Sequence, residues 1–367
     1  MIGKILLLGP QNTIDDPTNT GGTMVLFEQL LKEFDDLKIE YKVIDTNAQN
    51  YKNFYYTWIS VIYQFFKNFK DFEHISIHGT INHYITLAPV VIFVAKLFGK
   101  SVSLRKFAGN FDEVYKNSNT IVKKDIEYVL KNADINFFET KHLVSFFQRF
   151  NKNTFWFPNV REHTKDKNKK REFNKRFVFM SHVWKSKGVD EILEASKELD
   201  SSYTIDLYGY MNKKEYDEEY FNKYSNVSYK GALPPDKVMQ TLEKYDVLLL
   251  PTFYEGEGYP GIIIEAYSIG IPCITTRHKA IPEIVENNKS GILIEPKDTK
   301  ALVEAIKSFD KQNYISFSKE AKQAFKQFDS KIQTEKFLIS LSDICYKGGK
   351  SYNRFIKKSK SISDSDM

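Results

Sequence analysis

The chain has 367 residues, which is more than one core ordinarily supports and predicts two domains. Hydrophobic residues make up 42% and charged residues 27%, as in globular proteins, and no apolar run reaches the roughly 20 residues that cross a bilayer. The net charge of +6 arises from 53 basic and 47 acidic residues intermixed along the chain. These figures argue against an integral membrane protein and against a nucleic-acid partner.

The cysteines and the N-terminal segment indicate the compartment. Cys273 and Cys345 build no disulfide framework, and Ile5–Leu8 is too short for the apolar core of a signal peptide. We therefore expect a cytoplasmic protein.

The first half alternates short β-rich strings with longer amphipathic stretches, which predicts a βαβ series. The expected strands are Lys4–Gly9, Tyr41–Asp45, Ile75–Gly79, Ser101–Arg105, Asp134–Glu139 and Thr154–Phe157. The expected helices are Gly22–Phe34, Tyr55–Asn68, His83–Phe98, Val122–Asn132 and Lys141–Phe150. Because the strands are apolar on both faces, we expect a parallel sheet covered by helices on each side.

A charged stretch at 161–175 separates this series from a second one, and we interpret it as an interdomain linker. The expected strands of the second series are Phe177–Ser181, Thr204–Gly209, Val227–Lys230, Asp246–Pro251, Ile271–Thr275 and Gly291–Ile294. The pattern predicts two doubly wound, Rossmann-like α/β domains at 1–160 and 176–330, with a cleft between them. The expected remainder is a C-terminal helix at 331–346, able to return to the first domain, and a mobile tail at 347–367.

The segment with the clearest functional pattern directly follows the strand expected at 246–251. Doubly wound domains bind ligands beyond the carboxyl ends of their strands, which is where this segment lies. Residues 251–266 read PTFYEGEGYPGIIIEA. Pro260 suits the first turn of a helix, whose N-terminus is a natural seat for phosphate. Glu257 precedes that helix and Glu265 lies two turns inside it. This arrangement suits a sugar nucleotide, with hydroxyls at one end and phosphate in the middle; the alternative is that both carboxylates are merely solvated.

The segment resembles the E-x7-E signature of retaining glycosyltransferases of the GT-B architecture, especially family 4, with Glu257 and Glu265 at the two acidic positions. The resemblance covers most of the second half. It implies that Glu257 contacts the transferred sugar and that Glu265 binds the ribose hydroxyls. It also assigns donor contacts to the residues between them, namely Gly258, Tyr259, Pro260 and Gly261.

A second family element is a basic loop after the first strand of the C-terminal domain, usually G-R-x-x-x-x-K-G. Residues 181–188 read SHVWKSKG, so Lys187 matches the family's lysine and His182 replaces its arginine. An imidazole is not equivalent to a bidentate guanidinium, and Lys185 is a candidate to compensate. We predict that Glu257, Lys187 and His182 are catalytic, with Lys187 and His182 at the positions that grip the donor diphosphate in the family.

Glycine-containing strand ends complete the site that the resemblance implies. Gly209, Gly231 and Leu233 are expected near the nucleotide base. Gly21 and Gly22 are similar to the family's Gly–Gly loop, which approaches the donor phosphates and the acceptor. Many relatives carry His–Gly after the fourth strand, which this chain lacks. The candidates there for acceptor or phosphate contact are Arg105 and Asp112.

Two further features bear on partners. Tyr51–Phe72 is rich in aromatic residues and lysines, which fits either a membrane-surface helix facing a lipid-linked acceptor or an ordinary core helix.

His74, His78 and His83 have no carboxylate or thiol at metal-like spacing, and the DxD match Asp364–Asp366 falls in the tail. We therefore expect no metal and no cofactor, so that lysines and helix amides must stabilise the leaving group.

The predicted function is transfer of a hexose-type sugar from a UDP or GDP sugar to a glycan or lipid-linked acceptor with retention of configuration. Bacterial surface polysaccharide synthesis is the setting that the resemblance implies, with possible peripheral contact at the inner membrane. One alternative is a non-catalytic sugar-nucleotide or glycan-binding protein of the same fold. Another is an NAD-dependent dehydrogenase, which the sequence disfavours because no G-x-G-x-x-G follows the first strand.

Overall fold

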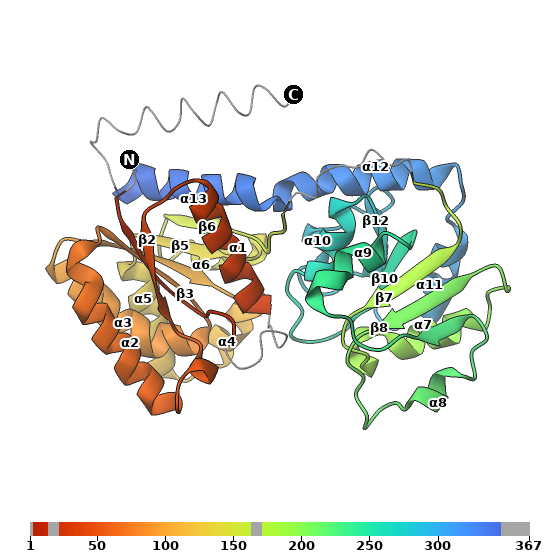
Figure 1. The fold of residues 1–367 in the computed structure, drawn as a ribbon, viewed down its shortest axis with the longest axis horizontal. Coiled ribbons are helices and arrows are strands. Elements are labelled where there is room, and N and C mark those ends of the chain that lie inside the picture. Colours follow the sequence, from red (N-terminus) through yellow and green to blue (C-terminus); the bar gives the residue numbers. More distant parts are fainter. Residues whose placement is uncertain (1–2, 14–21, 163–170, 346–367) are drawn as a thin grey trace. The chain divides into compact units, whose positions relative to one another are not determined.

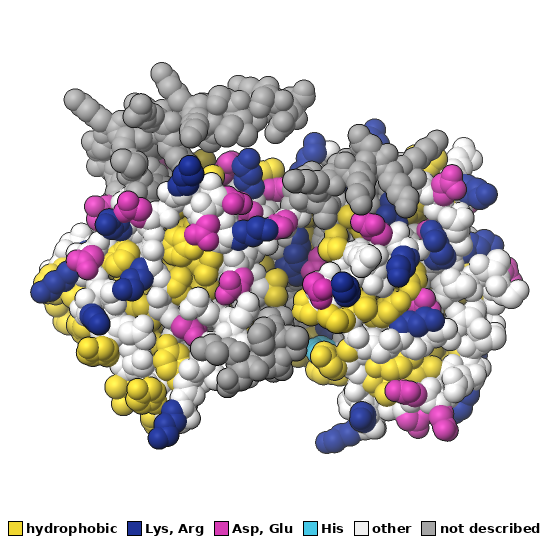
Figure 2. All heavy atoms as spheres, in the orientation of Figure 1, with side chains coloured by type: hydrophobic (Ala, Val, Ile, Leu, Met, Phe, Trp, Pro, Cys, Tyr) yellow, Lys and Arg dark blue, Asp and Glu magenta, His cyan; other side chains and the backbone are white. Residues whose placement is uncertain are grey.

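The computed structural model describes residues 3–13, 22–162 and 171–345, which belong to two compact units (Figure 1). Unit 1 comprises Met1–Val160 and Ser330–Met367, and unit 2 comprises Arg161–Asp329. Basic and acidic side chains are interspersed over the face shown in Figure 2. Within the described ranges we find no helix with both the length and the apolar character that a membrane span requires.

Unit 1 is built on a six-stranded parallel sheet with the strand order β2-β1-β3-β4-β5-β6. The strands are β1 (Ile5–Gly9), β2 (Tyr41–Asp45), β3 (His74–Gly79), β4 (Ser101–Lys106), β5 (Ile135–Phe138) and β6 (Thr154–Trp156). Every residue of β1 and β3 is buried. Such burial is expected of central strands that are covered on both faces.

Helices cover both faces of this sheet and form two apolar cores. The helices are α1 (Gly22–Asp36), α2 (Phe54–Asn68), α3 (Ile81–Leu97), α4 (Phe111–Asn117), α5 (Thr120–Asn132), α6 (Lys141–Phe147) and α13 (Ser330–Cys345). Side chains of α2 to α6 form one core, and those of α1 and α13 form the other. The two-sided cover agrees with the apolar strands predicted from the sequence.

Helix α13 belongs to unit 1 although it follows the whole of unit 2 in the chain. Its Phe337 is 1% exposed, and the ring centroid lies 4.8 Å from that of Phe137 and 5.3 Å from that of Phe157. Leu338 and Leu341 are fully buried in the same core. The last described helix is therefore a core element of the first unit.

Replacement of Phe337 by alanine should destabilise unit 1 by about 3–5 kcal/mol, because the side chain leaves a cavity among other aromatic rings. Urea unfolding followed by circular dichroism measures this loss. Lys336 is an exposed neighbour on the same helix, so Lys336→Ala should change the free energy of unfolding by less than about 0.5 kcal/mol. Equal midpoints for Phe337→Ala and wild type would show that α13 does not contribute to the core.

Unit 2 also has a six-stranded parallel sheet, with the strand order β12-β11-β10-β7-β8-β9. The strands are β7 (Arg176–Met180), β8 (Thr204–Tyr208), β9 (Val227–Tyr229), β10 (Val247–Leu250), β11 (Cys273–Thr276) and β12 (Gly291–Ile294). The helices are α7 (Val189–Ser196), α8 (Glu218–Phe221), α9 (Val238–Leu242), α10 (Gly261–Ser268), α11 (Thr299–Lys307) and α12 (Asn313–Phe325). The strand order reverses between β7 and β10, which is the topological switch point of this unit.

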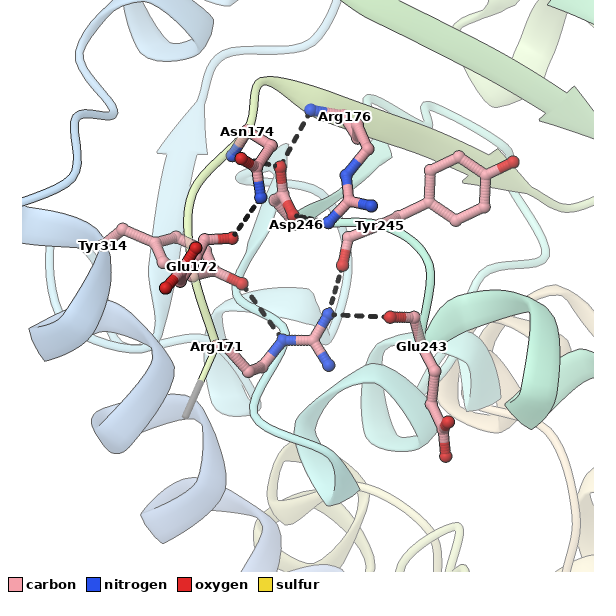
Figure 3. A network of polar contacts seen from close by, with 8 residues as sticks. All are labelled: Arg171, Glu172, Asn174, Arg176, Glu243, Tyr245, Asp246 and Tyr314. Carbon is pink, nitrogen blue, oxygen red and sulfur yellow. Dashed lines mark hydrogen bonds and ion pairs between the residues drawn. The ribbon is translucent and has the colours of Figure 1, made fainter. Parts of the chain in front are cut away.

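A polar network fastens the start of β7 to the start of β10 (Figure 3). The Asp246 carboxylate, 1% exposed, accepts hydrogen bonds from the backbone N–H groups of Asn174 and Arg176 at 2.7 and 2.9 Å. Arg171 donates to the Tyr314 hydroxyl at 3.2 Å and to the carbonyl of Tyr245. Residues 171–175, which we predicted to be part of a linker, are thus packed on unit 2. Residues 163–170 of that prediction and the tail at 347–367 lie outside the described residues.

Candidate functional site

The loops that follow β7 and β10 meet at the switch point of unit 2. Gly188 ends the first loop with φ of 83°, and a Cβ atom there would lie 2.2 Å from the carbonyl oxygen of Pro251. The backbone N–H of Phe253 donates to the carbonyl of Ser186 at 2.9 Å. Only glycine fits at position 188, and its absence of a side chain lets the two loops touch.

Lys187 and Glu257 form a buried ion pair across these loops. The Lys187 Nζ lies 2.6 Å from the Glu257 Oε2, and each side chain is only 9% exposed. The Thr252 hydroxyl donates to the same carboxylate oxygen at 2.9 Å, and the Lys187 ammonium lies 4.5 Å from the centre of the Tyr254 ring. Buried charges need such partners. Both charged groups are consequently held in fixed positions at the edge where ligands bind in this fold.

Helix α10 presents an N-terminus to the same loop region. Its N-cap is Pro260, no side chain caps it, and its first turn contains no acidic residue. Helix α7, by contrast, has Asp190 and Glu191 in its first turn. The partial positive charge at the start of α10 is therefore not offset by its own side chains, which favours an anion there.

Glu265, inside α10, is held by a residue that the sequence analysis had assigned to the linker. The Arg161 Nε donates to the Glu265 Oε1 at 2.6 Å, with the two side chains 18% and 21% exposed. The charge of the 161–175 stretch had suggested a solvated connection, and no spacing rule linked position 161 to position 265. Arg161 is thus a candidate site residue that sequence reasoning missed, as are Thr252 and Tyr254.

His182 and Lys185 are exposed, whereas Lys187, which was predicted to act with them on the diphosphate, is buried. The exposed His182 ring stacks on Trp184 with centroids 4.6 Å apart, and partial desolvation together with the charge of Lys187 lowers its pKa. His182 is therefore neutral at pH 7 and does not supply the positive charge of an arginine. Lys185 is exposed, with its Nζ 3.8 Å from an oxygen of Asp190.

The glycines predicted near a nucleotide base join neighbouring strand ends. Gly209 has φ of 143°, and a Cβ atom there would lie 1.7 Å from the carbonyl oxygen of Ser181. Its N–H donates to the carbonyl of Gly231 at 2.9 Å, and Leu233 is half-buried nearby in the chain. These contacts hold the carboxyl ends of β7, β8 and β9 together.

Two residues of the E-x7-E segment have buried side chains. Tyr259 is 3% exposed, donates to a Glu283 oxygen and packs edge-on against Phe328. Pro260 is also buried, whereas Gly258 and Gly261 are half-buried. At Tyr259 and Pro260 the backbone, not the side chain, is the part available to a ligand.

The sequence-based prediction for Arg105 does not agree with its position in unit 1. Arg105 is 2% exposed, its guanidinium lies 3.7 Å from the centre of the Phe157 ring, and its Nη2 donates to the carbonyl of Pro158 at 3.2 Å. Burial lowers its pKa to about 9, against the opposing charge of Glu139. Arg105 is thus a core residue without a surface for an acceptor, a correction that follows from its aromatic cover.

Asp112 and the Gly–Gly loop are the remaining predictions in unit 1. Asp112 is 6% exposed and accepts from Lys116 at 2.7 Å, with a His142 ring nitrogen 3.2 Å away. Its carboxylate is therefore already engaged by surface side chains. Gly22 is exposed at the start of α1, and Gly21 lies outside the described residues.

A pocket of about 190 Å³ lies at the switch point of unit 1, where the strand order reverses between β1 and β3. Its lining residues are Pro10, Thr23, Thr46, Asn47, Ala48, Thr57, Trp58, Gly79, Thr80, Asn82, His83 and Phe107. The rings of Trp58 and His83 meet edge to face with centroids 5.6 Å apart. Burial and the charge of Lys106 lower the pKa of His83 to about 4, so its imidazole is neutral at pH 7. An aromatic ring surrounded by hydroxyl, amide and imidazole groups suits a sugar.

Over residues 3–13, 22–162 and 171–345, no three His, Cys, Asp or Glu side chains are grouped as a metal site requires. His74 is hydrogen-bonded through both ring nitrogens, to the hydroxyls of Ser101 and Ser103 at 2.7 and 2.8 Å. His78 bonds the Ser76 hydroxyl at 2.9 Å. These two histidines are therefore structural residues of the sheet.

Comparison of the sequence with known proteins finds relatives of unit 2. Residues 160–328 match the family described as glycosyl transferases group 1. A 142-residue stretch is 30% identical to WcaL of Escherichia coli (strain K12), provisionally named a colanic acid biosynthesis glycosyltransferase, and covers 36% of this chain and 35% of WcaL. A 76-residue stretch is 37% identical to the amylovoran biosynthesis glycosyltransferase AmsK of Erwinia amylovora, covering 20% of this chain and 19% of AmsK. The chain thus matches about a third or less of the length of these relatives.

The whole chain resembles solved structures at the level of the fold. The structure of Alr3699/HepE from Anabaena in complex with UDP superposes with a TM-score of 0.68 and 13% identity, covering 93% of this chain and 100% of that one. The architecture is accordingly GT-B, with two Rossmann-like units built on parallel sheets. The family match at 160–328 falls almost entirely within unit 2.

The Lys187–Glu257 pair can be tested by a double-mutant cycle. Lys187→Gln should destabilise unit 2 by about 3–5 kcal/mol, because it leaves the Glu257 carboxylate buried without its counter-charge. The double variant Lys187→Gln with Glu257→Gln should recover part of this loss. Urea unfolding midpoints of the wild type, the two single variants and the double variant measure the coupling.

The exposed pair of Lys197 and Glu194 in the same unit is the matched control. Its nitrogen and oxygen lie 2.8 Å apart with side chains 56% and 53% exposed, so solvent screens the pair and Lys197→Gln should unfold at nearly the wild-type urea concentration. Equal costs for Lys187→Gln and Lys197→Gln would mean that the site pair is not buried in solution.

Proposed function

We propose that this chain is a glycosyltransferase that moves a hexose-type sugar from a nucleoside-diphosphate sugar to a glycan or lipid-linked acceptor. The observation that carries the proposal is the constellation at the switch point of unit 2. There a buried Lys187–Glu257 pair, the uncapped start of α10 and the Glu265 carboxylate come from two adjoining loops and one helix. UDP is the first candidate for the nucleotide, since HepE was solved with UDP and with UDP-glucose.

Each group has a role that follows from its charge and position. Lys187 and the N–H groups at the start of α10 stabilise the diphosphate, which gains negative charge as it departs. Glu257, fixed by Lys187 and Thr252, faces the sugar hydroxyls, and Glu265 accepts hydrogen bonds from the ribose. His182 donates a hydrogen bond from its ring N–H to a diphosphate oxygen. No metal ion takes part in this proposal.

We propose retention of the anomeric configuration by a front-face route. The bond between the anomeric carbon and the phosphate oxygen breaks, and the phosphate keeps the electron pair. The acceptor oxygen forms its bond to the anomeric carbon on the same face, and its proton passes to the departing phosphate. This route requires no separate catalytic base, because the departing phosphate takes the proton.

The pocket of unit 1 is our candidate for the acceptor site, in place of Arg105 and Asp112. Its support is the pairing of an aromatic ring, Trp58, with the polar groups of Thr80, Asn82 and His83 at the carboxyl edge of the sheet. Bacterial surface polysaccharide synthesis is the proposed setting, because WcaL and AmsK are named for such pathways. We place the reaction in the cytoplasm, with a lipid-linked acceptor at the inner face of the membrane.

A non-catalytic nucleotide-sugar-binding protein is the second candidate, because His182 stands where an arginine is expected. The two candidates differ in one measurement. A transferase consumes the donor, slowly with water and faster with acceptor, whereas a binding protein leaves it intact at full occupancy.

The donor site is tested through Glu265. Glu265→Gln should weaken UDP binding by roughly 10- to 100-fold, because a hydrogen bond to a charged group contributes about 1.5–3 kcal/mol. Isothermal titration with UDP, GDP and ADP measures the affinity and identifies the base. Glu304→Gln, on the exposed face of α11 in the same unit, should bind as the wild type does. If the wild type binds no nucleoside diphosphate, the proposed donor site is wrong.

The acceptor pocket is tested through Trp58. Trp58→Ala should raise the acceptor KM by roughly tenfold, the size of an aromatic contact worth about 1.5 kcal/mol. The affinity for UDP and the rate of donor hydrolysis should stay unchanged. Ile59→Ala, next to it on α2 but exposed, is the control with a water-soluble acceptor. An unchanged acceptor KM for Trp58→Ala would exclude this pocket.

A further inference from the structure

Helix α2 exposes an apolar stripe on the side opposite to its buried one. Val61 and Phe65 are fully buried in the core of unit 1. Tyr55, Ile59 and Tyr63, spaced four residues apart, are 79%, 68% and 65% exposed. Residues at this spacing share one face of a helix. The helix is therefore apolar on the solvent side as well as on the core side, which an ordinary surface helix is not.

Helix α3 continues the same surface. Val90, Phe93 and Leu97 are 39%, 58% and 66% exposed at helical spacing. The two helices meet at their C-terminal ends, where the Phe69 ring lies 6.2 Å from that of Phe66 and 5.1 Å from that of Phe98. We call the exposed apolar side chains of the two helices the α2–α3 face; they are Tyr55, Tyr56, Ile59, Tyr63, Phe66, Val90, Phe93, Leu97 and Phe98.

The two helices of the α2–α3 face carry charge of one sign. The 15 residues of α2 and the 17 residues of α3 include no aspartate or glutamate. Their charged residues are Lys67 and Lys96, both exposed, and the exposed lysines Lys52 and Lys70 flank α2. The first acidic residues after α2 are Asp71 and Glu73, whose charges oppose the desolvation that lowers the pKa of Lys100. The neighbouring helix α5, which packs on α3, carries Asp125 and Glu127. Figure 2 shows apolar side chains with basic ones beside them where Figure 1 draws α2 and α3.

We propose that the α2–α3 face docks on an anionic lipid bilayer. Contiguous exposed apolar surface marks interaction sites, and tyrosine and phenylalanine side chains are suited to the boundary between headgroups and acyl chains. Lysines reach from such a surface to lipid phosphates while their stems stay on apolar neighbours. Two helices that carry lysines and no carboxylate are complementary to negative headgroups, whereas a second copy of the same face would bring like charges together.

The docking proposal is independent of sugar transfer, because it concerns helix faces outside the site of unit 2. It does bear on the acceptor. Trp58 and His83, which line the pocket of unit 1, lie in the first turns of the same two helices. A chain docked through the α2–α3 face would carry that pocket to the bilayer surface.

Sedimentation of the full chain with vesicles tests the proposal. Vesicles of phosphatidylcholine mixed with phosphatidylglycerol should carry the wild type into the pellet, and vesicles of phosphatidylcholine alone should carry much less. Ile59→Asp and Phe93→Asp should each reduce binding at least about tenfold, since they remove the apolar burial. Lys67→Gln and Lys70→Gln should each reduce binding by about fivefold, and only to the anionic vesicles.

Ile121→Asp is the matched control, because Ile121 is 73% exposed on α5 of the same unit. It should bind vesicles as the wild type does, and circular dichroism should show that all variants are folded. The proposal is overturned if the wild type stays in the supernatant with anionic vesicles, or if Ile59→Asp and Ile121→Asp bind alike. It is also overturned if the wild type sediments as a dimer that Ile59→Asp dissociates while vesicles are not bound.

Discussion

All strand pairs in both sheets are parallel, and this constraint decides where the functional groups lie. A parallel neighbour cannot be reached by a hairpin, so most consecutive strands are joined through an α-helix, and β11 and β12 are joined through a 3-10 turn at Ile281–Glu283. All carboxyl ends consequently gather at one edge. The strand order reverses once in each unit, and in doubly wound sheets the loops at that point form the ligand site. The Lys187–Glu257 pair and the pocket beside Trp58 lie at these two places.

The two edges of the sheet in unit 2 use buried charge differently. At the amino edge, the Asp246 carboxylate accepts hydrogen bonds from the backbone N–H groups of Asn174 and Arg176 and from the Arg176 guanidinium (Figure 3). Its hydrogen-bonding needs are therefore met within the protein. At the carboxyl edge, Lys187 and Glu257 rely on each other and on Thr252, with few other partners. A buried ion pair is weak evidence for stability, because desolvation offsets much of the attraction. Its position beside an uncapped helix start is the reason that we assign the pair to the proposed donor site.

The strands and the E-x7-E segment could be predicted from the sequence, because each depends on residues that are close together in the chain. Buried parallel strands are continuous apolar runs, and the E-x7-E segment combines a glycine-rich turn with a helix start, so both were predictable. Arg105 was not, because its cover comes from Phe107 and Phe157, and the second ring lies some 50 residues away in the chain. Arg161 was assigned to a linker by composition, which carries no information about its partner Glu265. The composition of Tyr51–Phe72 showed many aromatic residues, but only the fold shows which of them are buried in the core of unit 1.

Helix α13 has a consequence for how the molecule is made. Synthesis proceeds from the N-terminus, and domains usually fold in that order as they emerge. Here the first unit lacks Phe337, Leu338 and Leu341 of its core until all of the second unit has been translated. The second unit is continuous in sequence and can be complete while the first still exposes the apolar surface that α13 will cover. The nascent chain therefore carries an unfinished N-terminal unit through most of translation, and that stage is where aggregation and chaperone capture should concentrate.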